Sequence, residues 1–135
     1  MSLLSVLPIQ SKDEQAAACA LCGVEFDTDL LAYKITDGDK LVGVCQFKMT
    51  PEGGKIFNIS CEKGTDCFEY MLMLGRGTLN FIDICGARYA YLDDSTVDDV
   101  MARAIGFRED ENGRYKVDLE GFFNEPCKHG CNGCN

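Results

Sequence analysis

The chain has little positive charge and no long apolar run, and each shortage excludes a class of protein. Its 135 residues carry 13 Lys and Arg against 22 Asp and Glu, a formal net charge of −9. Nucleic acids and anionic membranes both require a cationic surface, so this charge argues against either as a partner. No apolar run approaches the roughly 20 residues that a membrane helix needs.

The first residues also lack the basic segment of a secretory signal. Residues 1–12 read MSLLSVLPIQSK, with only a short apolar piece. We therefore expect a cytoplasmic protein whose nine cysteines are reduced thiols, since disulfide frameworks belong mainly to exported proteins. The single histidine, His129, lies close to the end of the chain, so a cysteine nucleophile elsewhere has no evident histidine base.

The length and the 46% hydrophobic content indicate one globular domain, without internal repeats. We assign residues 1–123 to this domain and residues 124–135 to a polar, glycine-rich and cysteine-rich tail. The acidic residues occur in clusters such as Asp93 and Asp94. We interpret these clusters as solvated surface at turns and helix starts.

The first half of the domain reads as one helix followed by an antiparallel meander. Ser11 and Glu14 have the spacing of a capping box and Gly23 suits a C-cap, which predicts a helix over residues 11–23. Residues 30–36 and 40–49 read as two strands joined by a tight turn at Gly38. Residues 55–61 form the third predicted strand.

Residues 55–92 form the central unit, a strand, a long helix and a second strand. The apolar positions over residues 66–85 recur at helical spacing and make a broad face, typical of a helix that lies against a sheet. Gly75 and Gly77 either allow a close approach to the sheet or mark a break. Residues 87–92 read as a short strand.

The last part of the domain reads as a helix and a hairpin. Ser95 or Thr96 is the expected N-cap of a helix that ends at Ile105. Residues 107–110 and 114–120 form a hairpin across Asn112-Gly113, the strongest short hairpin signal.

This order of elements and three short stretches resemble a known superfamily. The stretches are LVGVCQF, then LNFIDICG followed by ARYAYLD, and above all VMARAIGFRED with GRYKVDL. A helix that ends in Ile-Gly-Phe before a final hairpin is similar to the GNAT superfamily of N-acyltransferases. The resemblance implies an α+β fold: a mixed, mostly antiparallel twisted sheet of about six strands with a central βαβ unit and flanking helices.

The resemblance also implies a cofactor, acetyl-CoA or another acyl-CoA, held where two central strands part and at the start of the long helix. Helix N-termini suit a pyrophosphate because they carry partial positive charge and unpaired N–H groups. The positions in this chain that would hold the cofactor are Ile59, Ser60, Cys61, Lys63, Gly64, Thr65 and Asp66.

The chain departs from the family pattern at two places. The glycines of the family's phosphate loop would fall near Asp66, Glu69 and Met71, and none of these residues matches. The family's frequent catalytic Tyr falls on Ala102. Residues that could take over its role are Tyr70, Tyr89, Tyr91 and Cys67.

The cysteine tail suggests a second kind of site. Cys127, Cys131 and Cys134 follow a C-x3-C-x2-C pattern, and Cys19 and Cys22 follow C-x2-C. Three tail thiolates with Cys19, Cys22 or His129 could hold a zinc ion, and an iron–sulfur cluster has the same preference for thiolates. The alternative is a disordered tail that binds nothing.

Two functions follow. The first is an N-acyltransferase that moves an acetyl or acyl group from CoA to an amine on a small molecule or a peptide. The sequence does not decide whether the chain forms a homodimer. The second is an inactive module of the same fold that acts as a sensor through a metal-binding or redox-active cysteine tail.

The second hypothesis predicts bound metal. Protein purified without oxygen should then contain zinc or iron, measured by elemental analysis, and replacing Cys127, Cys131 and Cys134 by Ser should abolish it because the thiolate ligands are gone. Metal-free protein with an intact fold would exclude that hypothesis.

Overall fold

The computed structural model describes residues 3–62 and 67–123. The predicted tail over residues 124–135, with Cys127, Cys131 and Cys134, lies outside the described residues. The predicted cofactor positions Lys63, Gly64, Thr65 and Asp66 also lie outside them.

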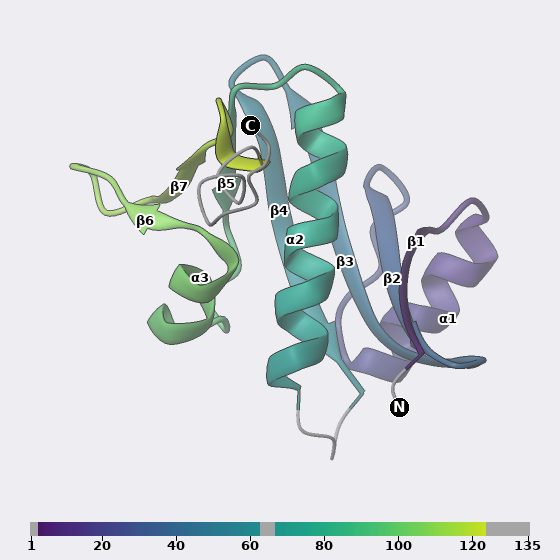
Figure 1. Ribbon diagram of the computed structural model, residues 1–135. Helices are drawn as coiled ribbons and strands as arrows, with labels where there is room; N and C mark the ends of the chain where they lie inside the picture. The colour runs from purple at the N-terminus through teal and green to yellow at the C-terminus, as the bar shows by residue number, and fades with distance from the viewer. Residues whose placement is uncertain (1–2, 63–66, 124–135) are drawn as a thin grey trace, which may run out of the picture.

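A single mixed sheet forms the centre of the described chain (Figure 1). It has seven strands in the order β1-β2-β3-β4-β5-β7-β6, and only β4 and β5 run parallel to each other. The strands are β1 Leu4–Pro8, β2 Leu31–Asp37, β3 Lys40–Thr50, β4 Gly53–Cys61, β5 Tyr89–Leu92, β6 Arg108–Glu109 and β7 Tyr115–Asp118. The predicted fold class is confirmed, with β1 as an added edge strand that the sequence pattern did not reveal.

Helix α1, Lys12–Cys22, begins and ends at the predicted caps. The Ser11 hydroxyl accepts a hydrogen bond from the Glu14 N–H at 3.2 Å, and Gly23 ends the helix with a φ of 73°. Local chemistry therefore sets both ends of this helix.

Helix α2, Phe68–Ile84, is continuous, which decides between the two interpretations of its glycines. A Cβ placed on Gly75 would lie 2.7 Å from the Ile105 side chain, and one on Gly77 would lie 2.6 Å from Val6. Both glycines thus allow close approach, to the third helix and to β1. The helix is shorter than the predicted residues 66–85, and Cys85 rather than Gly86 is its C-cap.

Helix α3, Asp99–Ile105, starts later than predicted. Its N-cap is Asp98, whose carboxylate accepts from the Met101 N–H at 2.8 Å. The predicted cap at Ser95 or Thr96 is wrong because Thr96 is hydrogen-bonded to Asp94, in the turn before the helix.

The helices lie on opposite faces of the sheet. On one face, α1 packs through Ala18, Cys19 and Cys22 against Ala32 and Val44. On the other face, α2 and α3 share the larger core with Val42, Cys45 and Phe47 of β3. Figure 1 shows α2 lying along the sheet, with α3 beside β6 and α1 beside the β1–β2 end. In the described part of the chain, no helix is long and apolar enough to cross a membrane.

Helix α2 also approaches the sheet closely at the start of β4. A Cβ on Gly54 would lie 2.6 Å from the Ile82 side chain. Its neighbour Gly53 has a φ of 140°, and a Cβ there would lie 2.1 Å from the Tyr89 carbonyl oxygen. The start of β4 therefore packs closely against both β5 and the end of α2.

Gly53→Ala should therefore lower the free energy of unfolding by roughly 3 to 5 kcal/mol, because a left-handed backbone cost and an overpacking cost add together. Gly38→Ala is the matched control: Gly38 has a φ of 63° and no atom within 4 Å of an added Cβ. It should cost only roughly 1 to 2 kcal/mol. Urea unfolding of both variants measures the difference, and equal losses would contradict this account of Gly53.

Candidate functional site

The candidate site lies where β4 and β5 part. The two strands pair only from Gly54 with Ala90 to Ile56 with Leu92, and β4 then continues to Cys61 paired with β3. The backbone bond that follows this pairing runs from the Asp93 N–H to the Ile56 carbonyl at 2.8 Å. We call the gap between residues 57–61 of β4 and Asp94 the β4–β5 opening.

A bulge in β4 marks the start of this opening. Gln46 pairs with Asn58 and Phe47 pairs with Ile56, so Phe57 is an extra residue on β4. Bulges bend a strand and re-aim its side chains, often next to functional sites. Here the bulge falls at the residue where β5 leaves.

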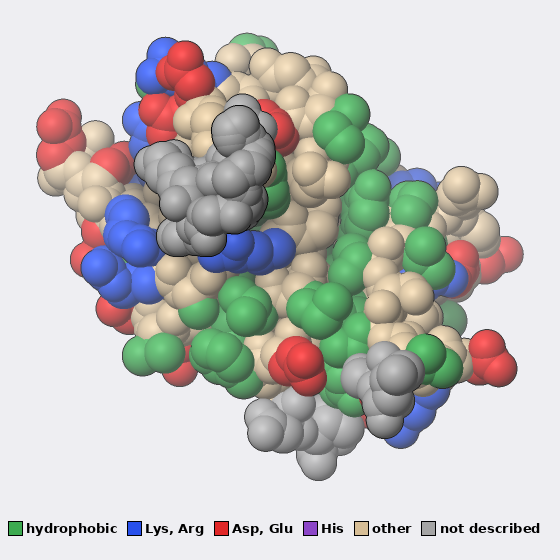
Figure 2. Space-filling model, viewed as in Figure 1, with side chains coloured by type: hydrophobic (Ala, Val, Ile, Leu, Met, Phe, Trp, Pro, Cys, Tyr) green, Lys and Arg blue, Asp and Glu red, His purple; other side chains and the backbone are tan. Residues whose placement is uncertain are grey.

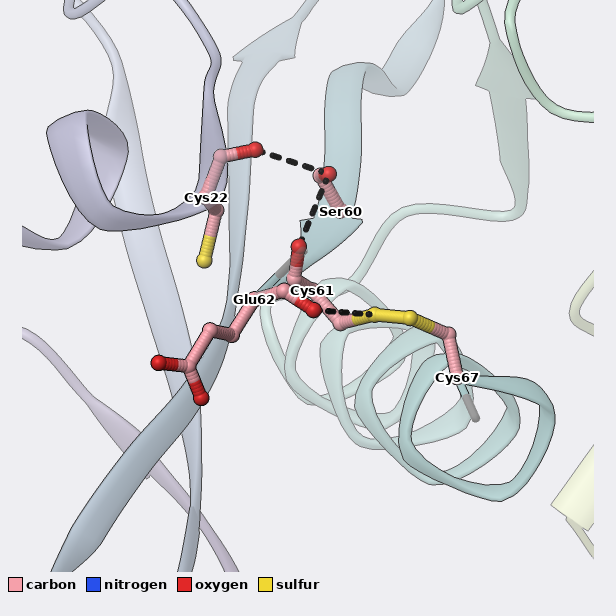
Figure 3. The surroundings of a disulfide bond; sticks show 5 residues. All are labelled: Cys22, Ser60, Cys61, Glu62 and Cys67. Carbon is pink, nitrogen blue, oxygen red and sulfur yellow. Dashed lines mark hydrogen bonds between the residues drawn. A yellow bond between two sulfur atoms is a disulfide. The ribbon is translucent and has the colours of Figure 1, made fainter. Parts of the chain in front are cut away.

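The predicted cofactor residues Ile59, Ser60 and Cys61 line the β4 side of the opening. The side chains of Ile59 and Cys61 are buried. The Ser60 hydroxyl donates to the Cys22 carbonyl oxygen of α1 at 3.1 Å, which Figure 3 shows. With these side chains engaged, a ligand in the opening would meet chiefly the backbone of β4.

Asp94 is a residue of this opening that the sequence did not reveal. One of its carboxylate oxygens accepts from the Ile59 N–H at 3.1 Å, although the two residues are 35 positions apart. The other accepts from the Thr96 N–H at 2.9 Å and from the Thr96 hydroxyl at 2.6 Å. Asp94 therefore lies beside a turn and is partly exposed, as predicted, but its carboxylate is also bound to the backbone of β4.

A disulfide joins Cys61, the last residue of β4, to Cys67, the N-cap of α2 (Figure 3). The expectation of reduced thiols is therefore wrong for this pair. Cys67 in this state has no thiolate to act as a nucleophile, because the thiolate is the reactive form. The bond ties the end of the strand to the start of the helix.

The N-cap position of α2 is held by Cys67, whose sulfur is in the disulfide and does not cap the helix by a hydrogen bond. Beside it lies a cavity of about 240 Å³. The cavity is lined by Cys67, Phe68, Met71, Thr96, Val97, Asp98, Val100 and Met101. Figure 2 shows hydrophobic side chains gathered around this end of α2 and across to α3. A helix start beside an apolar cavity suits a ligand with an anionic part and an apolar part.

The candidate tyrosines lie in different places. The Tyr70 hydroxyl donates to the Asp37 carboxylate at 2.8 Å, at the end of β2, and this bond is the main cause that raises the pKa of Tyr70. Tyr91 is buried on β5, where it pairs with Lys55 of β4, and the Arg114 guanidinium lies 4.1 Å from the centre of its ring. Tyr89 lies under the Lys116 ammonium at 4.2 Å. The three tyrosines therefore do not come together at one point of the described structure.

Ala102, at the position of the family's catalytic Tyr, is fully buried in the α2–α3 core. A methyl group there has no acid–base function.

A second cavity, of about 490 Å³, lies on the α1 side of the bulge. It is lined by Glu25, Phe26, Asp27, Thr28, Leu30, Phe57 and Asn58. Two carboxylates beside two phenyl rings suit an ammonium group on an apolar stem. The cavity and the opening share the β4 bulge.

Buried amides hold the wall of this second cavity. Gln46 donates to the Asn58 side-chain oxygen at 2.9 Å and to the Glu25 carbonyl at 2.8 Å, and it accepts from Gln15 at 2.8 Å. The Asp27 N–H donates to the same Gln46 oxygen at 3.2 Å. Gln15 and Gln46 are both almost fully buried, and buried amides that are satisfied in this way specify one arrangement.

Cys19 and Cys22, the predicted metal ligands of α1, are buried in the smaller core. Burial raises the pKa of both thiols, that of Cys22 to about 11, which disfavours the thiolate that binds metal. Residues 3–62 and 67–123 hold no group of three or more His, Cys, Asp or Glu side chains that could bind a metal ion. The tail half of the predicted site lies outside these residues.

Comparison with known proteins supports the fold and gives nothing finer. No protein family and no curated protein sequence matches the chain. An acetyltransferase from Bacillus subtilis solved with CoA is similar at TM-score 0.68 and 18% identity, covering 86% of this chain and 99% of that one. The ribosomal-protein-S18-alanine N-acetyltransferase of Escherichia coli is similar at TM-score 0.65 and 12% identity, covering 87% and 94%.

A GNAT-family acetyltransferase from Brucella melitensis solved with acetyl-CoA is also similar, at TM-score 0.65 and 12% identity, covering 86% and 88%. At such identities the likeness establishes the fold, and the fold expected from the sequence is confirmed: the chain has a GNAT-like fold.

The environments of the cysteines predict a graded reaction with iodoacetamide. In the native protein without reductant, exposed Cys85 should be alkylated quickly. Cys19, Cys22 and Cys45 should react only after unfolding, because burial raises their pKa values.

Cys61 and Cys67 should stay unmodified even in denaturant and react only after reduction. Peptide mapping by mass spectrometry measures each site. Alkylation of Cys67 without reductant would show that the disulfide is absent.

Proposed function

We propose that this chain, which has a GNAT-like fold, is an N-acyltransferase that moves an acyl group from coenzyme A to an amine. The observation that carries the proposal is the β4–β5 opening, where the edge of β4 lies beside the start of α2. Fold alone does not fix a reaction, so this local geometry has to support it.

The donor side of the site would use backbone groups. Past Ile56, no strand among the described residues pairs with β4 on the β5 side, and a strand edge of this kind can hydrogen-bond an extended ligand that carries amides. The start of α2 offers the positive end of a helix dipole to an anionic group. The cavity beside Phe68 and Met71 would receive an apolar part of the donor. These features fit an acyl-CoA, although the chain lacks the glycine pattern of the family's phosphate loop.

The acceptor side would be the opposite face of the sheet. The cavity lined by Glu25, Asp27 and Phe57 opens beside the β4 bulge, and its carboxylates would attract an ammonium group. The Gln15–Gln46–Asn58 amides keep this wall fixed against β4. We infer an acceptor that is an amine on a small molecule or a peptide.

The chemistry that such a site performs is mostly positioning. An acyl-CoA supplies an activated thioester carbonyl, and a neutral amine nitrogen forms a bond to its carbon while the carbon–sulfur bond breaks. The amine loses one proton and the leaving thiolate gains one. Holding the amine against the carbonyl from opposite faces of one strand edge contributes through proximity, which is worth several kcal/mol in well-oriented reactions.

Acetyl-CoA should therefore raise the melting temperature. At a free concentration about one hundred times Kd the stabilisation is roughly 2.7 kcal/mol, a shift of several degrees. Phe68→Glu should weaken the binding at least roughly ten-fold, because a carboxylate at the start of α2 competes with the anionic part of the donor. Differential scanning fluorimetry and calorimetric titration measure both effects.

Ile84→Glu is the matched control. It introduces the same carboxylate in place of an apolar side chain at the other end of α2, where Ile84 is 72% exposed. It should bind acetyl-CoA like the wild type. Wild-type protein that neither binds acetyl-CoA nor releases free thiol in the presence of simple amines would refute the proposed function.

A further inference from the structure

The Asp94 carboxylate lies inside the β4–β5 opening and takes the place of a strand partner there. It accepts from the Ile59 N–H, on the part of β4 that β5 no longer covers. An unpaired backbone N–H at such a position is costly, and a carboxylate is a strong acceptor for it. Asp94 thus satisfies a donor that the parting of the strands has left without a backbone partner.

The position of Asp94 is held from its own segment. Thr96 donates to one carboxylate oxygen through both its N–H and its hydroxyl, while the other oxygen faces Ile59. The Asp94 carbonyl also accepts from the Val97 N–H at 3.2 Å. The oxygen on Ile59 can therefore be released while the contacts to Thr96 remain.

The charge of Asp94 also affects Cys45, which pairs with Ile59 across β3 and β4. Burial is the main cause that raises the pKa of the Cys45 thiol to about 12, and the charge of Asp94 adds to this rise. This effect agrees with the position that the hydrogen bond to Ile59 gives the carboxylate.

We infer that Asp94 is a latch on the acyl-donor site, which the donor must displace from the Ile59 N–H before it can bind along β4. This inference rests on the proposed function. A ligand with amide or thioester carbonyls that adds to the edge of β4 needs the same N–H that Asp94 holds. The carboxylate also places a negative charge where an anionic donor enters, so it lowers the affinity in two ways.

Removal of the latch should strengthen donor binding, an effect opposite to that of an ordinary binding residue. Asp94→Ala frees the Ile59 N–H and should lower the Kd for acetyl-CoA by roughly ten-fold, the factor that 1.4 kcal/mol represents. Asp94→Asn keeps an oxygen for Ile59 but loses the charge, so its Kd should lie between those of the wild type and Asp94→Ala. Calorimetric titration with acetyl-CoA measures all three proteins.

Asp93→Ala is the matched control. Asp93 is an exposed neighbouring carboxylate that uses its backbone N–H, not its side chain, in the bond to Ile56. Its removal deletes one negative charge close to the opening and should leave the Kd within about two-fold of the wild-type value, since exposed charges interact weakly. Circular dichroism checks that each variant is folded.

Amide hydrogen exchange at Ile59 gives a second readout that needs no ligand. The Ile59 N–H should be protected in the wild type and in Asp94→Asn, and should exchange faster in Asp94→Ala, because the carboxylate is its acceptor. Unchanged protection in Asp94→Ala would overturn the latch whatever the titration shows.

The titration separates this inference from the proposed function. If the wild type binds acetyl-CoA and Asp94→Ala binds it equally or more weakly, the latch is wrong and the proposed function stands. Tighter binding by Asp94→Ala than by the wild type would support both. If neither protein binds acetyl-CoA, the proposed function fails and the latch fails with it.

Discussion

The structure depends on a difference in length between two neighbouring strands. β4 spans Gly53–Cys61, whereas β5 spans only Tyr89–Leu92. Parallel strands cannot exchange hydrogen bonds beyond the end of the shorter one, so the second half of β4 is left with backbone groups that face no strand. A bulge at Phe57 bends β4 where β5 ends, and the carboxylate of Asp94 accepts the hydrogen bond of the Ile59 N–H.

Because of this difference in strand length, the cavities on the two faces of the sheet both lie close to β4. The start of α2 and its apolar cavity lie on one side, and the cavity lined by Glu25, Asp27 and Phe57 lies on the other. A donor and an acceptor that enter from opposite faces would meet at the bulge. The disulfide from Cys61 to Cys67 fixes how far the strand end lies from the helix start, and the buried amides hold the wall of the second cavity.

The sequence was most informative where the cause is local. Ser11, Gly23 and Gly38 act within a few residues of themselves, and α1 and the first hairpin are as predicted. β1 was missed because a five-residue edge strand containing Pro8 shows little alternation.

The bond from Asp94 to Ile59 joins residues far apart in the chain, so no local pattern could show it. The expectation of reduced thiols came from the inferred compartment rather than from geometry, and it failed where geometry brings Cys61 and Cys67 together.

The glycines at the contacts of α2 restrict the position of this helix. Gly54 faces Ile82, Gly75 faces Ile105 and Gly77 faces Val6, each at a distance that leaves room for a hydrogen atom and no more. These contacts fix α2 along its axis, because a shift of the helix by one residue would place a side chain where only a glycine fits. The start of α2 therefore has a fixed position over the sheet.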